Sequence, residues 1–436
     1  MEISVLRRVK LLLVSSSVFA LACGADRVTA ADAPLVPGTV RDGLLVSTPA
    51  DEGIDAIALD SLVTQAKAEH SDALVVLRNG KLVYESLFGG ADDPIAVMSV
   101  SKSMVGVAVG LLIADGKLAS IDEPVAKVLP NFAAVDSRKA AITYRHLLTQ
   151  TSGLDPARAF GLGNDIEQRA LVTRCLFAPG TSWQYSNNGI DILGLAVGKL
   201  AGVPLDQYLS QRLFQPLGIS KFSWIHDVRG VPYGAGELSL RPIDLAKIGE
   251  VILDHGVWNG RTVIQRDWIK QSFTQSNSFE IDYGLLWWLP VNSPELVGVT
   301  SDLLVQWVGN GLSPAIATKL QALVGQTFFS VSAVGAAISA QLTADEFTQL
   351  GNLVTKGDHV QAARLVQAAP GSSFYGEGWL GQYLDIVPNR ALVAVRMRRA
   401  LASDYADQSV ELNAFGTFLP AALRLVPSAA SPLAPQ

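Results

Sequence analysis

The run Met-Ser-Val-Ser-Lys-Ser-Met-Val-Gly-Val-Ala-Val-Gly-Leu-Leu-Ile-Ala-Asp-Gly occupies residues 98–116. Beyond Ser103 it is apolar on every side, which is typical of a helix buried in a core and not of one lying on a surface. Gly116, followed by Lys117, indicates the C-terminal stop. We therefore expect a core helix over residues 99–116.

The start of this helix carries a chemical pattern, Ser99-Val100-Ser101-Lys102. A serine and a lysine one turn apart lie on the same helix face. The helix N-terminus also favours the oxyanion that forms when a serine attacks a carbonyl. This arrangement predicts a serine nucleophile whose base is the amine of Lys102. The pattern also fits a helix start capped by serines with a solvated lysine, and about one such spacing is expected by chance in a chain this long.

Residues 1–30 differ from the rest of the chain. Arg7, Arg8 and Lys10 precede the apolar run 11–22, and the small residues of 28–30 follow. This pattern predicts a signal peptide cleaved after Ala30, because the apolar run is too short to span a membrane. We expect an exported protein, periplasmic or secreted, without a transmembrane span. A lipid anchor on Cys23 is a second interpretation of the same segment.

The bulk composition excludes several classes of protein. With 436 residues, 49% of them hydrophobic, the chain has room for one large domain or two ordinary ones. Its net charge of −6 gives no electrostatic reason to bind nucleic acid. Cys175 is the only cysteine outside residues 1–30, so we expect no internal disulfide. The five histidines are scattered, and neither H-E-x-x-H nor C-x-x-C occurs, so we expect no metal and no other cofactor.

Strand patterns occur near both ends of the chain. Residues 73–78 and 81–85 flank Asn79-Gly80, the strongest short signal for a β-hairpin. A second strand pair is predicted at 381–387 and 391–397. The sequence thus predicts a mixed α/β fold of the α+β type, with an antiparallel sheet formed by N- and C-terminal strands and an inserted helical subdomain.

The expected organisation runs as follows: a domain over 31–425, its helical subdomain at about 120–270, a further helical insertion at about 293–370, a helix at 411–425 and a loose tail at 426–436. A capping box at Thr343–Glu346 opens a helix within the insertion. We expect this insertion to fold onto the main domain.

A second polar group precedes the apolar helix expected at 190–200. Tyr185 and Asn187 end the loop that begins at Phe177. Tyr185 is placed to relay a proton between Ser99, Lys102 and a leaving group, and Asn187 to hold a substrate amide or carbonyl. The alternative is that Asn187 caps the helix and the tyrosine is half-buried.

The glycine-rich word Gly376-Glu-Gly-Trp-Leu-Gly381 formally matches a dinucleotide fingerprint. That fingerprint needs a strand before it and a helix after it, whereas a strand follows here. We interpret the word as an edge strand whose glycines, Gly378 among them, allow close approach of a substrate. The N–H of Trp379 would then join that of Ser99 as an oxyanion pair.

The order S-x-x-K, Y-x-N and a glycine-rich strand resembles that of serine β-lactamases and penicillin-binding proteins. The surrounding words are similar to those of class C β-lactamase-like hydrolases of the esterase and 6-aminohexanoate-dimer hydrolase branch; they lie at 98–103, 144–154, 179–187, 283–288 and 381–383. The resemblance implies a β-lactamase-like fold and a small ester or amide substrate. It implies Ser99 as the acylated nucleophile, Lys102 and Tyr185 as the acid/base pair, and Asn187 near the substrate. His146 is interpreted as structural.

The chain departs from the β-lactam branch at Gly376 and Glu377, where that branch carries a cation that pairs with the substrate carboxylate. A glutamate facing the substrate would repel that carboxylate. We therefore expect hydrolysis of esters or simple amides. A β-lactamase or D-amino-acid peptidase acting on cell-wall-like substrates is one alternative, and a catalytically inactive sensor with the same pocket is another.

Overall fold

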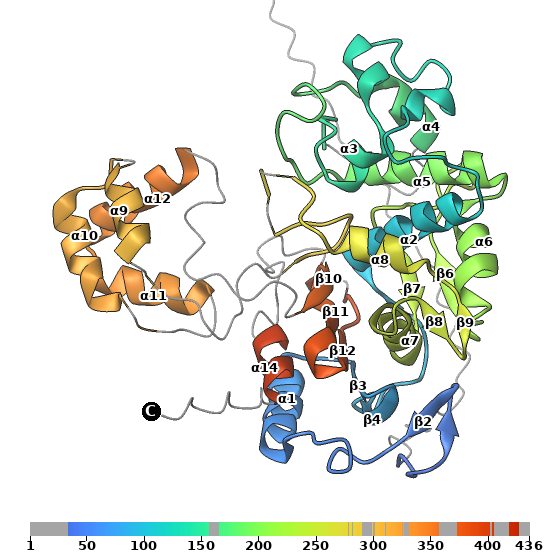
Figure 1. Ribbon diagram of the computed structural model, residues 1–436, viewed down its shortest axis with the longest axis horizontal. Helices are drawn as coiled ribbons and strands as arrows, with labels where there is room; N and C mark the ends of the chain where they lie inside the picture. The colour runs from blue at the N-terminus through green and yellow to red at the C-terminus, as the bar shows by residue number, and fades with distance from the viewer. Residues whose placement is uncertain are drawn as a thin grey trace, which may run out of the picture.

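The computed structural model describes residues 34–156, 165–277, 279–280, 282–289, 299, 301–309, 311–324, 326, 331–356, 373–401, 403–404 and 418–426. Its central sheet has seven strands in the order β1-β2-β4-β3-β12-β11-β10 (Figure 1). These strands are β1 (Val40–Arg41), β2 (Leu44–Val46), β3 (Ala73–Arg78), β4 (Lys81–Ser86), β10 (Phe374–Gly378), β11 (Gln382–Val387) and β12 (Leu392–Met397). All neighbours are antiparallel except β2 and β4. The predicted sheet, built from strands at both ends of the domain, is confirmed.

The hairpin between β3 and β4 turns at Asn79 and Gly80, whose φ angles are 51° and 75°. Two consecutive positive φ values are what a type I′ turn requires, so the sequence signal is explained by the backbone. The other edge of β3 pairs with β12, with Ala73 opposite Met397. The N-terminal hairpin therefore joins the C-terminal strands directly.

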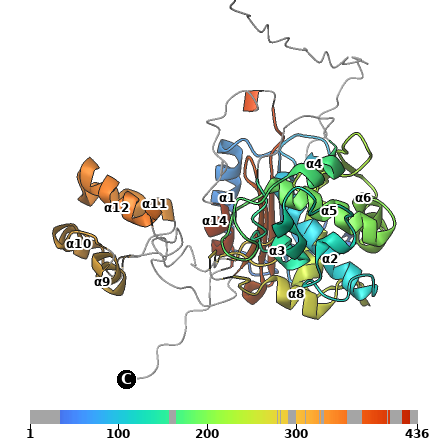
Figure 2. The same cartoon turned by 90° about the horizontal axis from the view of Figure 1, so that it is seen from above.

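Helices cover both faces of this sheet (Figures 1 and 2). On one face α7 (Pro242–Leu253) packs on β3, β11 and β12, and the same core continues through the buried α2 (Ser101–Ala114). On the other face lie α1 (Ala56–Ala68) and α14 (Phe418–Arg424). Successive residues of β3 point to opposite faces of the sheet and so belong to different apolar cores. Val75 lies in the core with α2 and α7, and Leu74 lies in the core with α1 and α14.

The helical subdomain contains more strand than expected. Its helices are α3 (Tyr144–Leu148), α4 (Ile166–Val172), α5 (Asn187–Ala201), α6 (Leu205–Leu209) and α8 (Arg266–Ser272), with the short turns η2 (Val125–Lys127), η3 (Ser137–Ala141) and η4 (Ser210–Phe214). Two small sheets accompany them, β5-β7-β6 (Ile95–Ala96, Leu238–Leu240, Phe222–Trp224) and β8-β9 (Val257–Trp258, Arg261–Thr262). Strands of two or three residues are too short for an alternation of polarity to reveal them.

The insertion is helical, as predicted, but its described side chains form a core of their own. It comprises α9 (Ser301–Gly309), α10 (Pro314–Leu320), η5 (Gln321–Leu323), α11 (Val331–Gln341) and α12 (Ala344–Lys356). The predicted capping box is present, with the Thr343 N–H 2.9 Å from Glu346 Oε2 and the Glu346 N–H 3.3 Å from Thr343 Oγ1. Trp307, Leu320 and Ile338 belong to a separate apolar cluster. In both views these helices stand apart from the sheet, which corrects the expectation that they fold onto it (Figures 1 and 2).

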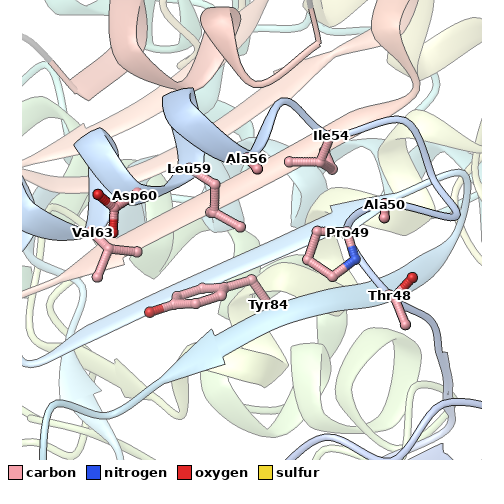
Figure 3. A pocket seen from close by; sticks show the side chains of 9 residues that line it. All are labelled: Thr48, Pro49, Ala50, Ile54, Ala56, Leu59, Asp60, Val63 and Tyr84. Carbon is pink, nitrogen blue, oxygen red and sulfur yellow. The ribbon is translucent and has the colours of Figure 1, made fainter.

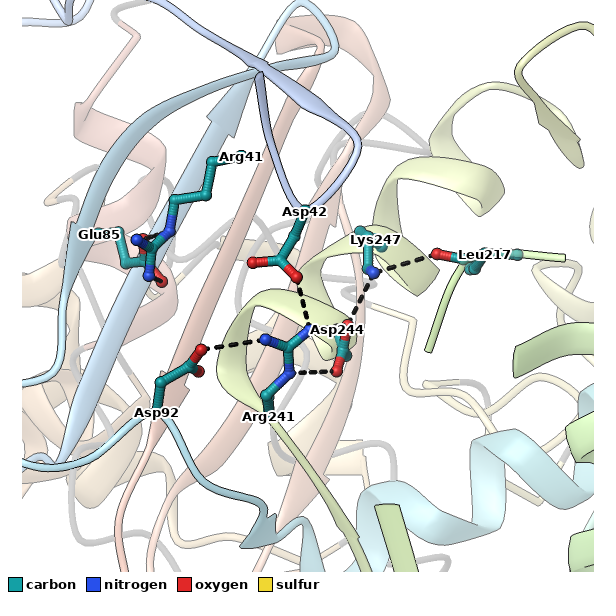
Figure 4. A network of polar contacts seen from close by, with 8 residues as sticks. All are labelled: Arg41, Asp42, Glu85, Asp92, Leu217, Arg241, Asp244 and Lys247. Atoms are coloured by element: carbon teal, nitrogen blue, oxygen red, sulfur yellow. Dashed lines mark hydrogen bonds and ion pairs between the residues drawn. The ribbon is translucent and has the colours of Figure 1, made fainter. Parts of the chain in front are cut away.

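A buried ionic network ties α7 to the N-terminal strands (Figure 4). The guanidinium of Arg241 binds Asp244 at 2.8 Å, Asp42 at 2.7 Å and Asp92 at 3.0 Å. Lys247 closes the network through a 2.7 Å ion pair with Asp244. Arg241, Asp244 and Lys247 are buried, whereas Asp42 and Asp92 are partly exposed. The network joins the β1–β2 turn and the segment after β4 to the start of α7.

Several predictions fall on residues outside the described ranges. These are the signal peptide with Cys23, the start of the helix expected at 411–425, and all of the tail at 426–436 except Val426. Within the described ranges, no single helix has both the length and the apolar character needed to cross a bilayer. The bent pair Asn187–Ala201 and Leu205–Phe214 meets those two criteria when its helices are taken together.

Candidate active site

Ser99 lies at the centre of the site. It sits on the single turn η1 (Met98–Val100) that leads into α2, not within the α-helix itself. The Nζ of Lys102, in the first turn of α2, is 2.8 Å from Ser99 Oγ. The structure thus brings the two residues together at hydrogen-bond distance.

Lys102 is held in a buried position. Its side chain is 2% exposed and its Nζ also donates to the carbonyl of Ala235 at 2.6 Å. Asp191 on α5 in turn accepts the N–H of Ala235 at 3.0 Å, which fixes the turn that carries this carbonyl. Among the described residues Lys102 forms no ion pair. A buried amine without a counter-ion is an expensive arrangement for structure alone.

Two other serines close to Ser99 are occupied elsewhere. Ser101 Oγ donates to the carbonyl of Met98 at 2.6 Å, and Ser103 Oγ donates to the carbonyl of Leu286 at 2.8 Å. Of these three described hydroxyls, that of Ser99 is the one hydrogen-bonded to the Lys102 amine. This difference singles out Ser99 as the candidate nucleophile.

Tyr185 lies beside the lysine. The Nζ of Lys102 is 4.8 Å from the centroid of its ring, and the ring of Trp288 stacks on it at 6.5 Å with an interplanar angle of 12°. Asn187 is the first residue of α5, at the same helix end. The cap itself is Ser186, whose Oγ accepts the Gly189 N–H at 3.0 Å, so the alternative in which Asn187 caps the helix is wrong.

Strand β10 forms the edge of the sheet next to Ser99, as the glycine-rich word predicts. A Cβ on Gly378 would lie 3.0 Å from Ser99 N and 2.5 Å from the carbonyl oxygen of Val97. Only glycine allows so close an approach of the strand to the η1 turn. Trp379 is the next residue and begins the turn that follows β10. This turn is closed by a 3.0 Å hydrogen bond from the Gly381 N–H to the Gly378 carbonyl.

Glu377 is not brought to Ser99. Residues of a strand alternate between faces, and both Gly376 and Gly378 face the η1 side. Glu377 lies on the other face, where the Tyr383 hydroxyl is 3.3 Å from its Oε1. Tyr383 belongs to the cluster beneath α1 and α14. Burial raises the pKa of Glu377 to about 7. The expectation that this carboxylate faces the substrate is therefore corrected.

His146 has a structural position, in agreement with its interpretation from sequence. Its Nδ1 lies 3.2 Å from the Thr143 N–H, and Thr143 Oγ1 accepts the His146 N–H at 3.3 Å. These two bonds form a capping box at the start of α3. Burial lowers the pKa of the imidazole.

Aromatic rings extend the site from Tyr185 to β10. The successive neighbours are Trp183, Tyr185 and Trp288, with Tyr283 edge-on to Trp288 at 4.8 Å. Trp288 also stacks on Tyr375 of β10, whose side chain lies on the same face of the strand as Glu377. The stretch 283–288 is similar to the family in sequence, but its pattern predicts no role for Tyr283 or Trp288. A row of flat apolar faces with few polar groups is typical of a small-molecule site.

One groove among the described residues lies apart from this site. It has a volume of about 420 Å³, lies between α1 and β4, and is lined by Pro49, Leu59 and Tyr84, among others (Figure 3). Leu59 and Tyr84 belong to the α1 and α14 face of the sheet, away from Ser99. No group of three or more His, Cys, Asp or Glu side chains suited to a metal ion occurs in the described part of the chain.

The chain is similar in sequence to known proteins. The β-lactamase family model matches residues 59–397. The chain is 32% identical to esterase EstB of Burkholderia gladioli over 219 residues, 42% of this chain and 55% of that protein. It is 28% identical to the 6-aminohexanoate-dimer hydrolase of Paenarthrobacter ureafaciens over 254 residues, 51% of this chain and 63% of that one.

A solved structure supports the fold. A penicillin-binding protein homologue from Caulobacter crescentus superposes with a TM-score of 0.53 and 14% identity, over 86% of this chain and 97% of that chain. The chain matches between about half and two thirds of the length of the two curated relatives above. Since the family model spans most of the sequence, the chain belongs to the β-lactamase family.

Proposed function

We propose that this protein is a serine hydrolase that cleaves esters or simple amides through an acyl intermediate on Ser99. The observation that carries the proposal is the 2.8 Å contact between Ser99 Oγ and the buried Nζ of Lys102. The names of the relatives, an esterase and an amide-dimer hydrolase, support the same class of reaction.

In the proposed acylation, Lys102 Nζ takes the proton of Ser99 Oγ as that oxygen attacks the substrate carbonyl carbon. The tetrahedral intermediate collapses when the bond to the leaving group breaks. The Tyr185 hydroxyl donates a proton to the leaving oxygen or nitrogen and is then reprotonated by Lys102. The Nζ of Lys102 lies 4.8 Å from the centroid of the Tyr185 ring. A water molecule then repeats the sequence on the acyl ester, which releases the acid and restores the Ser99 hydroxyl.

The oxyanion of this intermediate needs hydrogen-bond donors that are already in place. Ser99 N lies where the approach of Gly378 brings the end of β10 against the η1 turn. We assign the backbone N–H groups of Ser99 and Trp379 to this task. The close packing of strand against turn would hold both donors without reorganisation during the reaction.

The proposal includes export of the protein. Residues 1–30 carry the pattern of a signal peptide, and Cys23 offers a site for lipid attachment. The test is the mass of the protein recovered separately from the cytoplasm, the membrane, the periplasm and the medium. Loss of residues 1–30 supports cleavage after Ala30, a chain beginning with a lipid-modified Cys23 supports anchoring, and an intact N-terminus refutes export by this route.

Labelling by a fluorophosphonate probe tests the nucleophile. Intact-mass measurement should show one adduct on the wild type and none on Ser99→Ala. The matched controls are Ser101→Ala and Ser103→Ala, whose hydroxyls already donate to carbonyls and whose loss should leave labelling in place. An adduct that persists on Ser99→Ala refutes the assignment.

The base and the substrate class need separate tests. Lys102→Ala should slow acylation by more than the ~10²–10⁴-fold typical of general acid–base catalysis, and a rate within tenfold of wild type would move the base role to Tyr185. Turnover of a short-chain nitrophenyl ester should exceed that of a chromogenic cephalosporin. The reverse order would favour the β-lactamase or peptidase alternative, and no turnover or labelling at all would favour the sensor.

A further inference from the structure

Gln150 occupies an unusual position in the loop after α3. Its side chain is 2% exposed, and its backbone φ is 59°, in the left-handed region. A residue with a Cβ pays on the order of 1–3 kcal/mol for that conformation, whereas glycine adopts it freely. A buried glutamine at such a place indicates that the side chain contributes something a glycine cannot.

Two hydrogen bonds of Gln150 are made to the residues on either side of the candidate catalytic tyrosine. Its backbone carbonyl accepts the N–H of Gln184 at 2.9 Å. Its side-chain Oε1 accepts the N–H of Ser186 at 2.9 Å. Gln184 and Ser186 immediately precede and follow Tyr185, so a single residue holds the backbone at both flanks of the tyrosine.

The bond from the Ser186 N–H to Gln150 Oε1 also affects the start of α5. Ser186 caps α5, since its Oγ accepts the Gly189 N–H at 3.0 Å. The oxygen of Gln150 therefore fixes the residue at which the tyrosine loop becomes a helix. Tyr185 projects from between this anchor and Gln184, with its ring 4.8 Å from Lys102 Nζ.

We propose that Gln150 is a positioning residue for Tyr185: by binding the backbone on both sides of the tyrosine, it sets the place of the phenol beside Lys102 for proton transfer. This inference rests on the proposed function. Misplacing a catalytic group by about 1 Å can cost about 10²-fold in rate. Loss of the Oε1 bond should therefore reduce the acylation rate without weakening substrate binding.

Two substitutions separate the acceptor oxygen from the bulk of the side chain. Gln150→Met keeps the volume and removes the oxygen, and we expect it to lower the acylation rate and kcat ten- to 100-fold with KM within twofold. Gln150→Glu keeps an oxygen at the same place and should restore most of the rate. Gln150→Gly relieves the backbone strain and keeps the carbonyl bond to Gln184, so it provides a folded variant that should also be slow.

The matched control is Thr149→Val in the preceding residue. The Thr149 hydroxyl is buried and lies 2.9 Å from the carbonyl of Arg145 and 2.8 Å from Thr151 Oγ1. Neither contact is with Gln184, Tyr185 or Ser186. This variant should lower the melting temperature and leave the acylation rate within twofold. An equal loss of rate in Thr149→Val would assign the effect to the loop as a whole and overturn the proposal.

A double-mutant cycle with Tyr185→Phe gives the decisive readout. If Gln150 acts through the phenol, Gln150→Met should cost less than twofold in the Tyr185→Phe background. A full ten- to 100-fold cost there overturns the inference, as does a wild-type rate for Gln150→Met when Tyr185→Phe is slow. A wild-type rate for Tyr185→Phe refutes the role of the tyrosine in the proposed function, and this inference with it.

Discussion

Gly378→Ala should slow acylation strongly while the protein stays folded. The added Cβ would lie 2.5 Å from the Val97 carbonyl oxygen, 2.9 Å from Met98 Cβ and 3.0 Å from Ser99 N. Ordinary contacts of a Cβ begin near 3.4 Å. Two of these three neighbours are backbone atoms of the η1 region, so no side chain can rotate to relieve the contacts. The end of β10 must therefore move away from Ser99 by roughly 0.5–1 Å.

That displacement carries Trp379 N–H away from the proposed oxyanion. Removing one oxyanion donor typically costs about 10²–10³ in kcat, or about 3–4 kcal/mol of transition-state stabilisation. Overpacking of a folded interior costs about 1–3 kcal/mol of stability. We therefore expect a drop of about 100-fold in the acylation rate together with a measurable fall in melting temperature.

The assay is stopped-flow acylation by a nitrophenyl ester, with the melting temperature of each variant measured in parallel. The matched control is Gly376→Ala on the same strand and face, where the new Cβ meets Val100 Cγ1 at 2.9 Å, an atom at the end of a side chain. This contact costs stability because Val100 is buried and branched at Cβ, but it involves no backbone atom of Ser99, so the control should lose less than tenfold in acylation rate. An acylation rate for Gly378→Ala within threefold of wild type would refute both the close approach and the role of the strand.

Three further changes test other parts of the molecule. Arg241→Ala leaves the buried Asp244 paired with Lys247 alone and removes the partner of the partly exposed Asp42 and Asp92. It should cost about 3 kcal/mol in the free energy of unfolding by urea. Arg229→Ala, on an exposed pair with Asp165, should cost about 1 kcal/mol or less, and equal costs would contradict the role given to the network. Burial raises the pKa of Glu250 from 4.5 to about 7. The protonated carboxyl therefore adds to the stability of the fold below pH 4.5, and this contribution is lost as the pH rises through about 7 and the buried group ionises. Glu250→Gln should therefore raise the unfolding free energy by up to about 3 kcal/mol at pH 8 and by little at pH 4, and a gain that does not vary with pH would argue against this titration. Because Glu377 faces the Tyr383 side of the sheet, Glu377→Gln should leave unchanged the ratio of kcat/KM for a carboxylate-bearing substrate and its neutral ester, and a shift of tenfold in that ratio would place the carboxyl at the site after all.

The features that sequence predicted well are those fixed by local structure. The buried helix, the Asn79-Gly80 hairpin and the spacing of Ser99 and Lys102 each depend on a few consecutive residues. Their conformations follow from periodicity and from the φ preferences of glycine and asparagine. The same reasoning placed β11 and β12 to within one residue at each end.

The features that sequence missed depend on pairing between distant segments. Which face of β10 meets the η1 turn is decided by its register with β11, where Glu377 lies opposite Tyr383. The residues Gly376–Gly381 alone do not indicate which residues of β11 they will face. The contact of Ala235 with Lys102 uses a backbone carbonyl, which every residue has. Gln150 binds backbone N–H groups more than 30 residues away, so composition gives no signal for either contact.

The ends of the helical insertion meet at one place in the main domain. Trp288 and Tyr375 form a bridge, with N–H to carbonyl distances of 3.0 and 3.1 Å. Because this bridge holds the two ends side by side, the main domain bears the entropic cost of closing a loop there, and that cost rises by only about 0.6 kcal/mol for each doubling of loop length. Lengthening the chain between these two residues should therefore cost the main domain little free energy, and a reporter or an affinity module grafted there should leave its folding intact.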